Sequence, residues 1–111
     1  MGICRIWHGW TVPENADAYE RLLESEIFGG IAARGIHGYR GIELLRREGP
    51  DLTEFVTIMK FDSLEAVRAF AGVDYEMAVV PPKARALLEG YDARSAHYVI
   101  RYSAQSLPPG P

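Results

Sequence analysis

Residues 3–10, which read Ile-Cys-Arg-Ile-Trp-His-Gly-Trp, bring together the side chains of this chain that are best suited to chemistry. Strand alternation places Arg5 and Trp7 on one face and His8 on the other. An arginine among apolar side chains must pair with an acceptor or meet an anion. Arg5 is therefore a candidate clamp for a phenolate or carboxylate, and a salt bridge to a neighbouring glutamate is the simpler alternative.

Three further side chains, those of Trp7, His8 and His97, could each have either a functional or a structural role. Trp7 offers a flat stacking surface and an N–H that needs a partner when buried, so either a ligand pocket or core packing explains it. His8 is interpreted as a hydrogen-bonded structural histidine. His97 could meet His8 or the pocket, depending on a strand register that the sequence leaves open. Two histidines are too few for a typical metal site, so we predict none.

Composition describes an ordinary globular chain. The 111 residues are 48% hydrophobic and carry a net charge of −3, so we predict one domain over residues 1–102 and no nucleic-acid partner. The single Cys4 excludes an internal disulfide and is interpreted as a buried thiol. No stretch approaches the roughly 18 apolar residues of a membrane helix, and no signal peptide is visible. We therefore expect no membrane partner and a cytoplasmic location.

Hydrophobic periodicity and turn signals predict six main elements. Strands are expected over 3–10, 38–48, 52–61 and 95–102. The first helix is expected to be capped by Asn15, interrupted at Gly29-Gly30 and ended by Gly35. A second helix is expected over 64–71, and a short one over 83–89. Residues 103–111 are interpreted as a loose tail.

The order strand, helix, strand, strand, helix, strand predicts an α+β, ferredoxin-like βαββαβ domain with a four-stranded antiparallel sheet. Helices cover one face of such a sheet. The strands are apolar on both faces, so the second face also needs a cover. A second copy of the chain, packed sheet against sheet, is the cover that we predict.

With these elements placed, the chain resembles the antibiotic biosynthesis monooxygenase family from Ile3 to about Tyr102. The resemblance rests on Ile-Trp-His-Gly with Pro13, on Gly38-Tyr39-Arg40-Gly41, on Phe61-Asp62-Ser63-Leu64-Glu65-Ala66 with Phe70, and on His97-Tyr98. It implies two chains paired into a dimeric α+β barrel. Family members include cofactor-independent monooxygenases on polyketide-type phenols, haem-degrading enzymes and proteins without an assigned activity.

The resemblance also allows a residue-by-residue test for haem. The strand-one asparagine of the haem degraders would fall at Trp7 and their second-helix tryptophan at Phe70. Their haem-ligating histidine would fall near Val79 or Val80, where no imidazole is present. Haem degradation by that route is therefore disfavoured, and we predict no cofactor.

The resemblance implies that a ligand cavity lies between the sheet and the helices and that Trp7 faces it. Met59, Phe70 and Tyr75 are candidates to complete an aromatic cavity there, and ordinary core packing is the alternative. Oxygen chemistry without a cofactor needs an electron-rich anion, a dry pocket, a base and a cation near the developing charge. Arg5 is our candidate cation and His97 our candidate base.

Three functions remain in competition. The first is a cofactor-independent monooxygenase acting on an aromatic or polyketide-like molecule. The second is a non-catalytic dimeric module that binds a small hydrophobic ligand, and the third is an isomerase or decarboxylase on the same scaffold. A charged or titratable group inside the cavity would favour an enzyme, whereas a cavity of hydrocarbon alone would favour the binding module.

Overall fold

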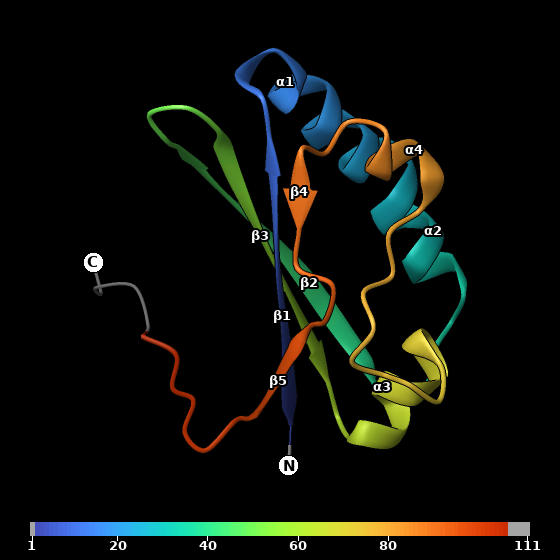
Figure 1. Cartoon of the computed structure of the whole chain (residues 1–111). Helices are drawn as coiled ribbons and strands as arrows, with labels where there is room; N and C mark the ends of the chain where they lie inside the picture. The colour runs from blue at the N-terminus through green and yellow to red at the C-terminus, as the bar shows by residue number, and fades with distance from the viewer. Residues whose placement is uncertain (1, 107–111) are drawn as a thin grey trace, which may run out of the picture.

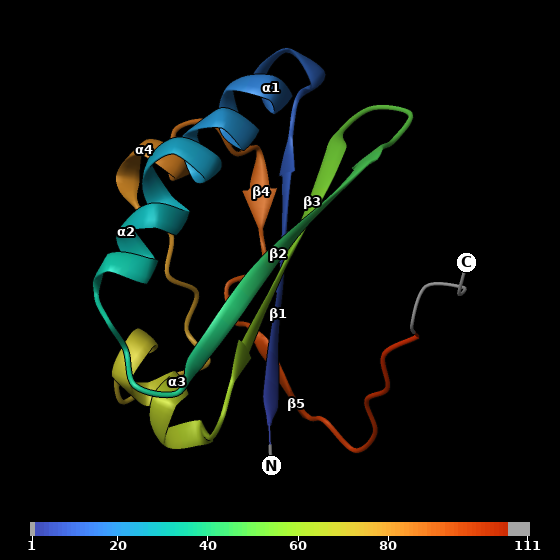
Figure 2. The ribbon, with the colours of Figure 1, turned by 180° about the vertical axis from the view of Figure 1, so that it is seen from behind.

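The computed structural model describes residues 2–106. Its elements are β1 (Ile3–Thr11), α1 (Pro13–Leu22), the π-helical segment η1 (Leu23–Ile27), α2 (Phe28–Ala33), β2 (Tyr39–Glu48), β3 (Thr53–Phe61), α3 (Leu64–Ala71), α4 (Pro82–Arg85), β4 (Gly90–Tyr91) and β5 (Ala96–Val99). All the helices lie on one side of a single antiparallel sheet (Figures 1 and 2). The predicted ferredoxin-like α+β arrangement is confirmed.

The sheet has the strand order β2-β3-β1-β4, and β5 also pairs with β1. We predicted four strands, and the structure has five because the last strand position is divided. β4 pairs with the C-terminal end of β1 and β5 pairs with its N-terminal half. Residues 92–95 pass between them outside the ladder. The predicted strand over 95–102 is therefore too long, since β5 ends at Val99.

The first helix starts earlier than predicted, with Pro13 in its first turn. Val12 occupies the N-cap position and makes no side-chain cap hydrogen bond. Proline suits this position because its missing N–H would be unpaired there anyway. The predicted cap, Asn15, instead donates from its side chain to the Leu87 carbonyl oxygen at 3.4 Å. The prediction of a helix was right and the prediction of its cap was wrong.

Gly29 and Gly30 do not interrupt the helix, contrary to our prediction. Both lie inside α2, and a Cβ at either position would meet nothing within 4 Å. The irregularity falls before them, at η1, where the helical turn is wider. Close approach of a neighbouring strand therefore does not explain these glycines.

The α3 helix has the bounds that the sequence predicts. The Ser63 hydroxyl accepts a hydrogen bond from the Ala66 N–H at 3.2 Å, which caps the helix, and Gly72 follows its last turn with φ of 95°. The short helix predicted over 83–89 forms only as α4, because the chain has to turn into β4 at Gly90.

Buried side chains form two clusters on the helix-covered face. One joins Ile3, Met59 and Phe61 to the α3 residues Val67 and Phe70. The second joins Phe55 to residues of α1, η1 and α4, and here the rings of Tyr19 and Phe55 meet edge to face at 4.9 Å. Residues of both clusters also line one cavity, together with Arg5 and Trp7 of β1.

No helix formed by residues 2–106 lies against the opposite face of the sheet (Figures 1 and 2). Strand alternation and register place Ile6, Val56, Ile58 and the exposed side chains of Leu45 and Tyr98 there. We call the surface formed by these five residues the open face. The same alternation also places Glu43, Glu54 and Lys60 on this side of the sheet, so the prediction that both faces of the strands are apolar holds only in part.

The C-terminal segment leaves the sheet after β5. Residues 101–106 are exposed and extend away from the helices (Figure 1). The predicted tail over 103–111 falls partly on residues 107–111, which lie outside the described residues, as does Met1. Within residues 2–106, no helix is long and apolar enough to cross a membrane.

Candidate functional site

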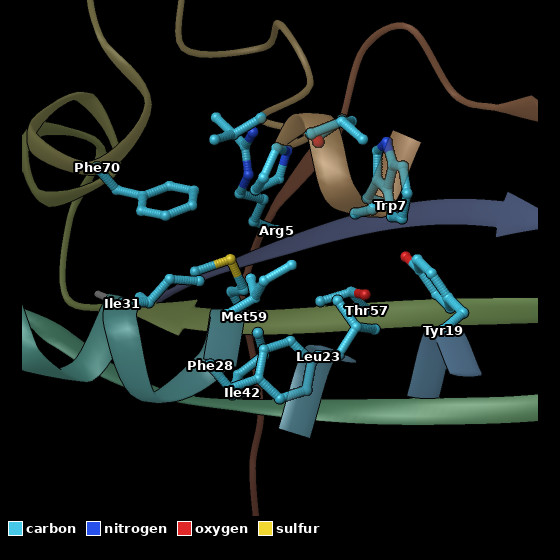
Figure 3. Close-up of a pocket in the computed structure, with 16 residues that line it drawn as sticks. Arg5, Trp7, Tyr19, Leu23, Phe28, Ile31, Ile42, Thr57, Met59 and Phe70 are labelled. Carbon is cyan, nitrogen blue, oxygen red and sulfur yellow. The ribbon is translucent and has the colours of Figure 1, made fainter. Parts of the chain in front are cut away.

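A cavity that is partly open to solvent lies between the sheet and the helices (Figure 3). Strands β1, β2 and β3 form its floor, and its walls come from α1, η1, α2, α3, α4 and the segment before α4. The lining residues are Arg5, Trp7, Tyr19, Leu23, Ile27, Phe28, Ile31, Ile42, Thr57, Met59, Phe70, Val79, Val80, Pro81, Ala84 and Ser95. Most of these side chains are hydrocarbon, which is typical of a ligand pocket.

Arg5 is the charged residue of this lining and is only 3% exposed. Its Nη1 donates to the Tyr75 carbonyl oxygen and to His97 Nε2 at 3.0 Å, and its Nη2 donates to the Met77 carbonyl oxygen at 3.1 Å. The guanidinium also lies 5.4 Å from the centre of the Phe70 ring. Burial lowers the pKa of Arg5 to about 10, so the group stays charged at neutral pH.

Each of these acceptors is neutral. Among residues 2–106 no carboxylate lies within salt-bridge distance of Arg5, so the expected alternative of a pairing with glutamate is not observed. The exposed arginines differ, because Arg40, Arg46 and Arg94 each contact carboxylates. The cavity therefore contains a buried cation whose charge is not neutralised.

His97 contacts Arg5 but does not line the cavity. Because a guanidinium cannot accept a hydrogen bond, His97 Nε2 must be the acceptor and the ring proton must be on Nδ1. That Nδ1 is buried and has no hydrogen-bond partner among residues 2–106, and the ring packs edge to face against Tyr75 at 5.1 Å. Burial, and then the charge of Arg5, lower the pKa of His97. The geometry is that of a neutral side chain that positions Arg5.

Trp7 faces the cavity, and its indole N–H donates to the Asp92 carbonyl oxygen at 2.8 Å. The position of its ring depends on Gly9, because a Cβ there would lie 2.8 Å from the nearest ring carbon. We did not predict this role for Gly9. The sequence does contain a pattern that could have predicted it, because Gly9 follows Trp7 by two residues and therefore lies on the same strand face.

The other predicted lining residues have different positions. Met59 and Phe70 line the cavity, and Figure 3 shows Arg5 between Phe70 and Trp7. The Tyr75 side chain does not line it, and this residue contributes its backbone carbonyl to Arg5 instead.

The two histidines predicted as possible neighbours are on opposite faces of the sheet. The register pairs Arg5 with His97, which places His97 on the helix-covered side, whereas His8 is on the other side. His8 Nδ1 and Asp92 Oδ2 are 2.7 Å apart, which agrees with a hydrogen-bonded structural histidine. In residues 2–106 no cluster of three or more potential metal-ligating side chains was found.

Ser95, Thr57 and Tyr19 are polar lining residues that the sequence analysis did not single out. Burial raises the pKa of Tyr19, so its hydroxyl stays protonated. Ser95 is 4% exposed, and its Oγ has no hydrogen-bond partner within the described part of the chain. Ser95 and His97 are two residues apart, so strand alternation places them on the same face of the sheet. This pattern could have identified Ser95 only if the face occupied by His97 had been known.

Comparison with known proteins supports the fold. No protein-family model matches the sequence, and no curated protein matches it. A solved structure from Bacillus cereus, provisionally named an antibiotic biosynthesis monooxygenase, has a TM-score of 0.66 and 14% identity and covers 98% of this chain and 100% of its own. SnoaB, a cofactor-independent oxygenase from Streptomyces nogalater, has a TM-score of 0.57 and 22% identity, with 97% and 98% covered.

Two other solved structures bear on assembly and on haem. A dimeric ferredoxin-like protein from an uncultured marine organism has a TM-score of 0.65 and 10% identity over 96% of this chain and 100% of its own. A haem degrader from Mycobacterium tuberculosis has a TM-score of 0.55 and 19% identity over 93% and 99%. This chain therefore has the fold that is shared by antibiotic biosynthesis monooxygenases and related ferredoxin-like proteins.

The cavity residues do not fit haem held by an axial histidine. The positions compared with the haem degraders are Trp7, Phe70, Val79 and Val80, and all four line the cavity. No lining side chain is an imidazole or a thiolate, which are common axial ligands of haem iron.

Proposed function

We propose that this protein is a cofactor-independent monooxygenase that acts on an aromatic or polyketide-like molecule bound as its phenolate or enolate. The observation that carries the proposal is Arg5, a buried guanidinium with only neutral partners in a largely apolar cavity. A cavity of hydrocarbon alone would have favoured simple ligand binding. The likeness to SnoaB supports the scaffold for this chemistry.

The chemistry requires a substrate that supplies all the electrons. Oxidation of an anthrone-type CH₂ to a carbonyl uses one O₂, places one oxygen atom in the product and releases the other as water. The four electrons come from the substrate, so no external reductant is needed. A fixed cation stabilises the substrate anion and the negative charge that passes to oxygen, and this effect is strongest where water is excluded.

The sequence suggested His97 as the base that removes a proton from the substrate, and we now propose a different role for it. His97 Nε2 is already the acceptor for Arg5, so His97 is better suited to positioning than to acting as the base. A cation beside an acidic hydroxyl lowers its pKa. We therefore propose that Arg5 favours binding of a substrate that is already ionised, and that His97 fixes the orientation of Arg5.

An oxygen-uptake assay with an anthrone or a hydroquinone as substrate tests this function. Arg5→Met is expected to lower the rate about 100-fold or more, as found when one group that stabilises an oxyanion is removed. Arg5→Lys should retain part of the rate, because it keeps the charge but not the planar geometry. Arg101→Met removes an exposed arginine and should have no effect. Full activity of Arg5→Met would contradict the proposal.

The alternative function is a binding module for a small hydrophobic ligand. It is favoured by the lining itself, in which no histidine or carboxylate is available as a base. Binding of aromatic compounds without oxygen uptake, across anthrones and hydroquinones, would favour this alternative.

We also infer that two copies of the chain pair through the open face. This inference is supported by the apolar side chains that the open face leaves without a cover. It is also supported by the dimeric ferredoxin-like protein with the same fold.

A further inference from the structure

Ser95 has an unpartnered hydroxyl beside the cavity. The residue is 4% exposed and lines the cavity, yet its Oγ has no hydrogen-bond partner in the described part of the chain. Its backbone N–H is satisfied, since it donates to the Glu76 carbonyl oxygen at 2.6 Å. Burial of a hydroxyl without a partner costs free energy, so its presence at a cavity needs a reason.

The position of Ser95 associates it with Arg5. Ser95 immediately precedes β5, where Ala96 pairs with Ile6 and His97 pairs with Arg5. Ser95, Arg5 and Trp7 all line the cavity. The hydroxyl, the cation and the indole ring therefore belong to one region of the wall, where β1 meets the start of β5.

Arg5 retains the capacity to bind a ligand. A guanidinium has five N–H donors, and Arg5 uses three of them on Tyr75, His97 and Met77. Two donors and the full positive charge therefore remain for an anionic oxygen of a ligand.

We propose that Ser95 is a specificity-determining residue that, with Arg5, binds one anionic oxygen of the ligand. Because the Ser95 Oγ is enclosed in this structure, the side chain has to rotate about its Cα–Cβ bond to donate a hydrogen bond to that oxygen. Arg5 donates another, and Trp7 packs on the attached ring. A phenolate or enolate fits better than a carboxylate, because its charge spreads over an apolar ring and matches the hydrocarbon lining. The choice of ligand class rests on the proposed function, but the oxygen site requires no oxygen chemistry.

A coloured hydroxyanthraquinone such as alizarin is a suitable probe, because its absorbance reports whether the hydroxyl is ionised. The wild-type protein is expected to bind the ionised form and to lower the apparent pKa of the dye by about one unit. Ser95→Ala should weaken binding of the ionised dye about 10-fold, the usual loss for one hydrogen bond to a charged group. The downward shift of the dye pKa should also become smaller.

Thr11→Val is the matched control. Thr11 also has a buried hydroxyl without a partner among the described residues, but it does not line the cavity. Removal of either unpartnered hydroxyl is expected to keep the melting temperature or raise it by about 2–4 °C. Only Ser95→Ala should weaken binding of the dye. Weakened binding in a variant that melts no earlier than the wild type cannot be attributed to misfolding.

Three results would overturn this inference: no binding of the dye to the wild type, a loss of less than twofold in Ser95→Ala, or an equal loss in Thr11→Val. Tighter binding of 2-naphthoate than of ionised 2-naphthol would overturn the choice of phenolate over carboxylate. Failure of the proposed function is distinguishable. A protein that binds the dye as predicted but oxidises no anthrone retains the oxygen site and loses the oxygenase assignment.

Discussion

Arg46 and Arg5 differ in the charge of the groups that they contact. Arg46 contacts Asp17, Glu20 and Glu48, and such exposed contacts contribute little to stability. Arg5 is buried among carbonyl groups and an imidazole, which fix its geometry without cancelling its charge. Desolvation of a charge is costly unless something compensates for it. A bound anion would supply that compensation.

The lowered pKa of His97 predicts that the stability of the folded protein depends on pH. Its pKa is lowered in the folded protein by burial and by the charge of Arg5, whereas an unfolded histidine titrates near pH 6.5. Below about pH 6.5 the unfolded chain therefore binds more protons than the folded chain at this position. Stability should fall as the pH drops from about 6.5 toward the folded pKa of His97 and then level off as far as this group is concerned.

Urea unfolding at several pH values measures this effect. His97→Gln cannot titrate but can still accept a hydrogen bond from Arg5, so the loss of stability between about pH 6.5 and 5 should become smaller. His37→Gln removes another histidine and provides the control. An unchanged pH dependence in His97→Gln would contradict the assigned protonation of His97.

At the scale of elements, β1 was the most predictable part of the site. Period-two alternation alone places Arg5 and Trp7 on one face, and the structure has both in the cavity lining. The partner of Arg5 could not be predicted, because the last strand is divided and its register is fixed by tertiary packing. Ser95 was placed in the predicted last strand and Val79 in an ambiguous segment, and neither could be assigned to the cavity wall. Both lie in irregular segments, which an isolated bridge between Met77 and Arg94 holds together.

The helical segments α1, η1 and α2 show a second feature that hydrophobic periodicity could not predict. Tyr19, Leu23, Ile27 and Ile31 follow one another at four-residue spacing, and all line the cavity. A regular helix would rotate such a series gradually away from the cavity. The wider turn of η1 compensates for that rotation. A π-helical turn has no simple sequence signal, so the irregularity was assigned instead to Gly29-Gly30.

Gly30→Ala should therefore stabilise the protein. Gly30 is helical and exposed, and an added Cβ meets nothing within 4 Å. Replacement should raise the free energy of unfolding by roughly 0.5–1 kcal/mol, because alanine loses less conformational entropy in a helix. Denaturant titration measures the change. A destabilised Gly30→Ala would mean that the glycine is needed as a break in the helix.

Gly35→Ala provides the contrast for this measurement. Gly35 also has open space around it, but its φ is +60°. A residue with a Cβ is strained there, so the same substitution should cost roughly 1–2 kcal/mol. The two variants add the same methyl group and should shift stability in opposite directions.

At the scale of the whole molecule, the described part of the chain covers one side of the sheet with helices and leaves the other side without them. The helices cover the cavity side, while the C-terminal segment through residue 106 extends away on the other side (Figures 1 and 2). Ile6 and Ile58 are paired on adjacent central strands of the open face. A second copy placed here would bury these side chains and would leave the cavity on the helix side of each copy.

Ile58→Lys should convert the proposed dimer into a folded monomer. The lysine would lie between Ile6 and Glu43, where water can solvate it in a single copy but not inside a sheet-to-sheet contact. Sedimentation should give twice the mass of the chain for the wild type and a single-chain mass for the variant, with the circular dichroism spectrum retained. Val73→Lys is the control, since Val73 is 94% exposed and lies after α3, outside the sheet. A wild-type protein that sediments as a folded single copy would refute pairing through the open face. It would leave the Arg5 cavity unaffected, because all the described contacts of that cavity come from one chain.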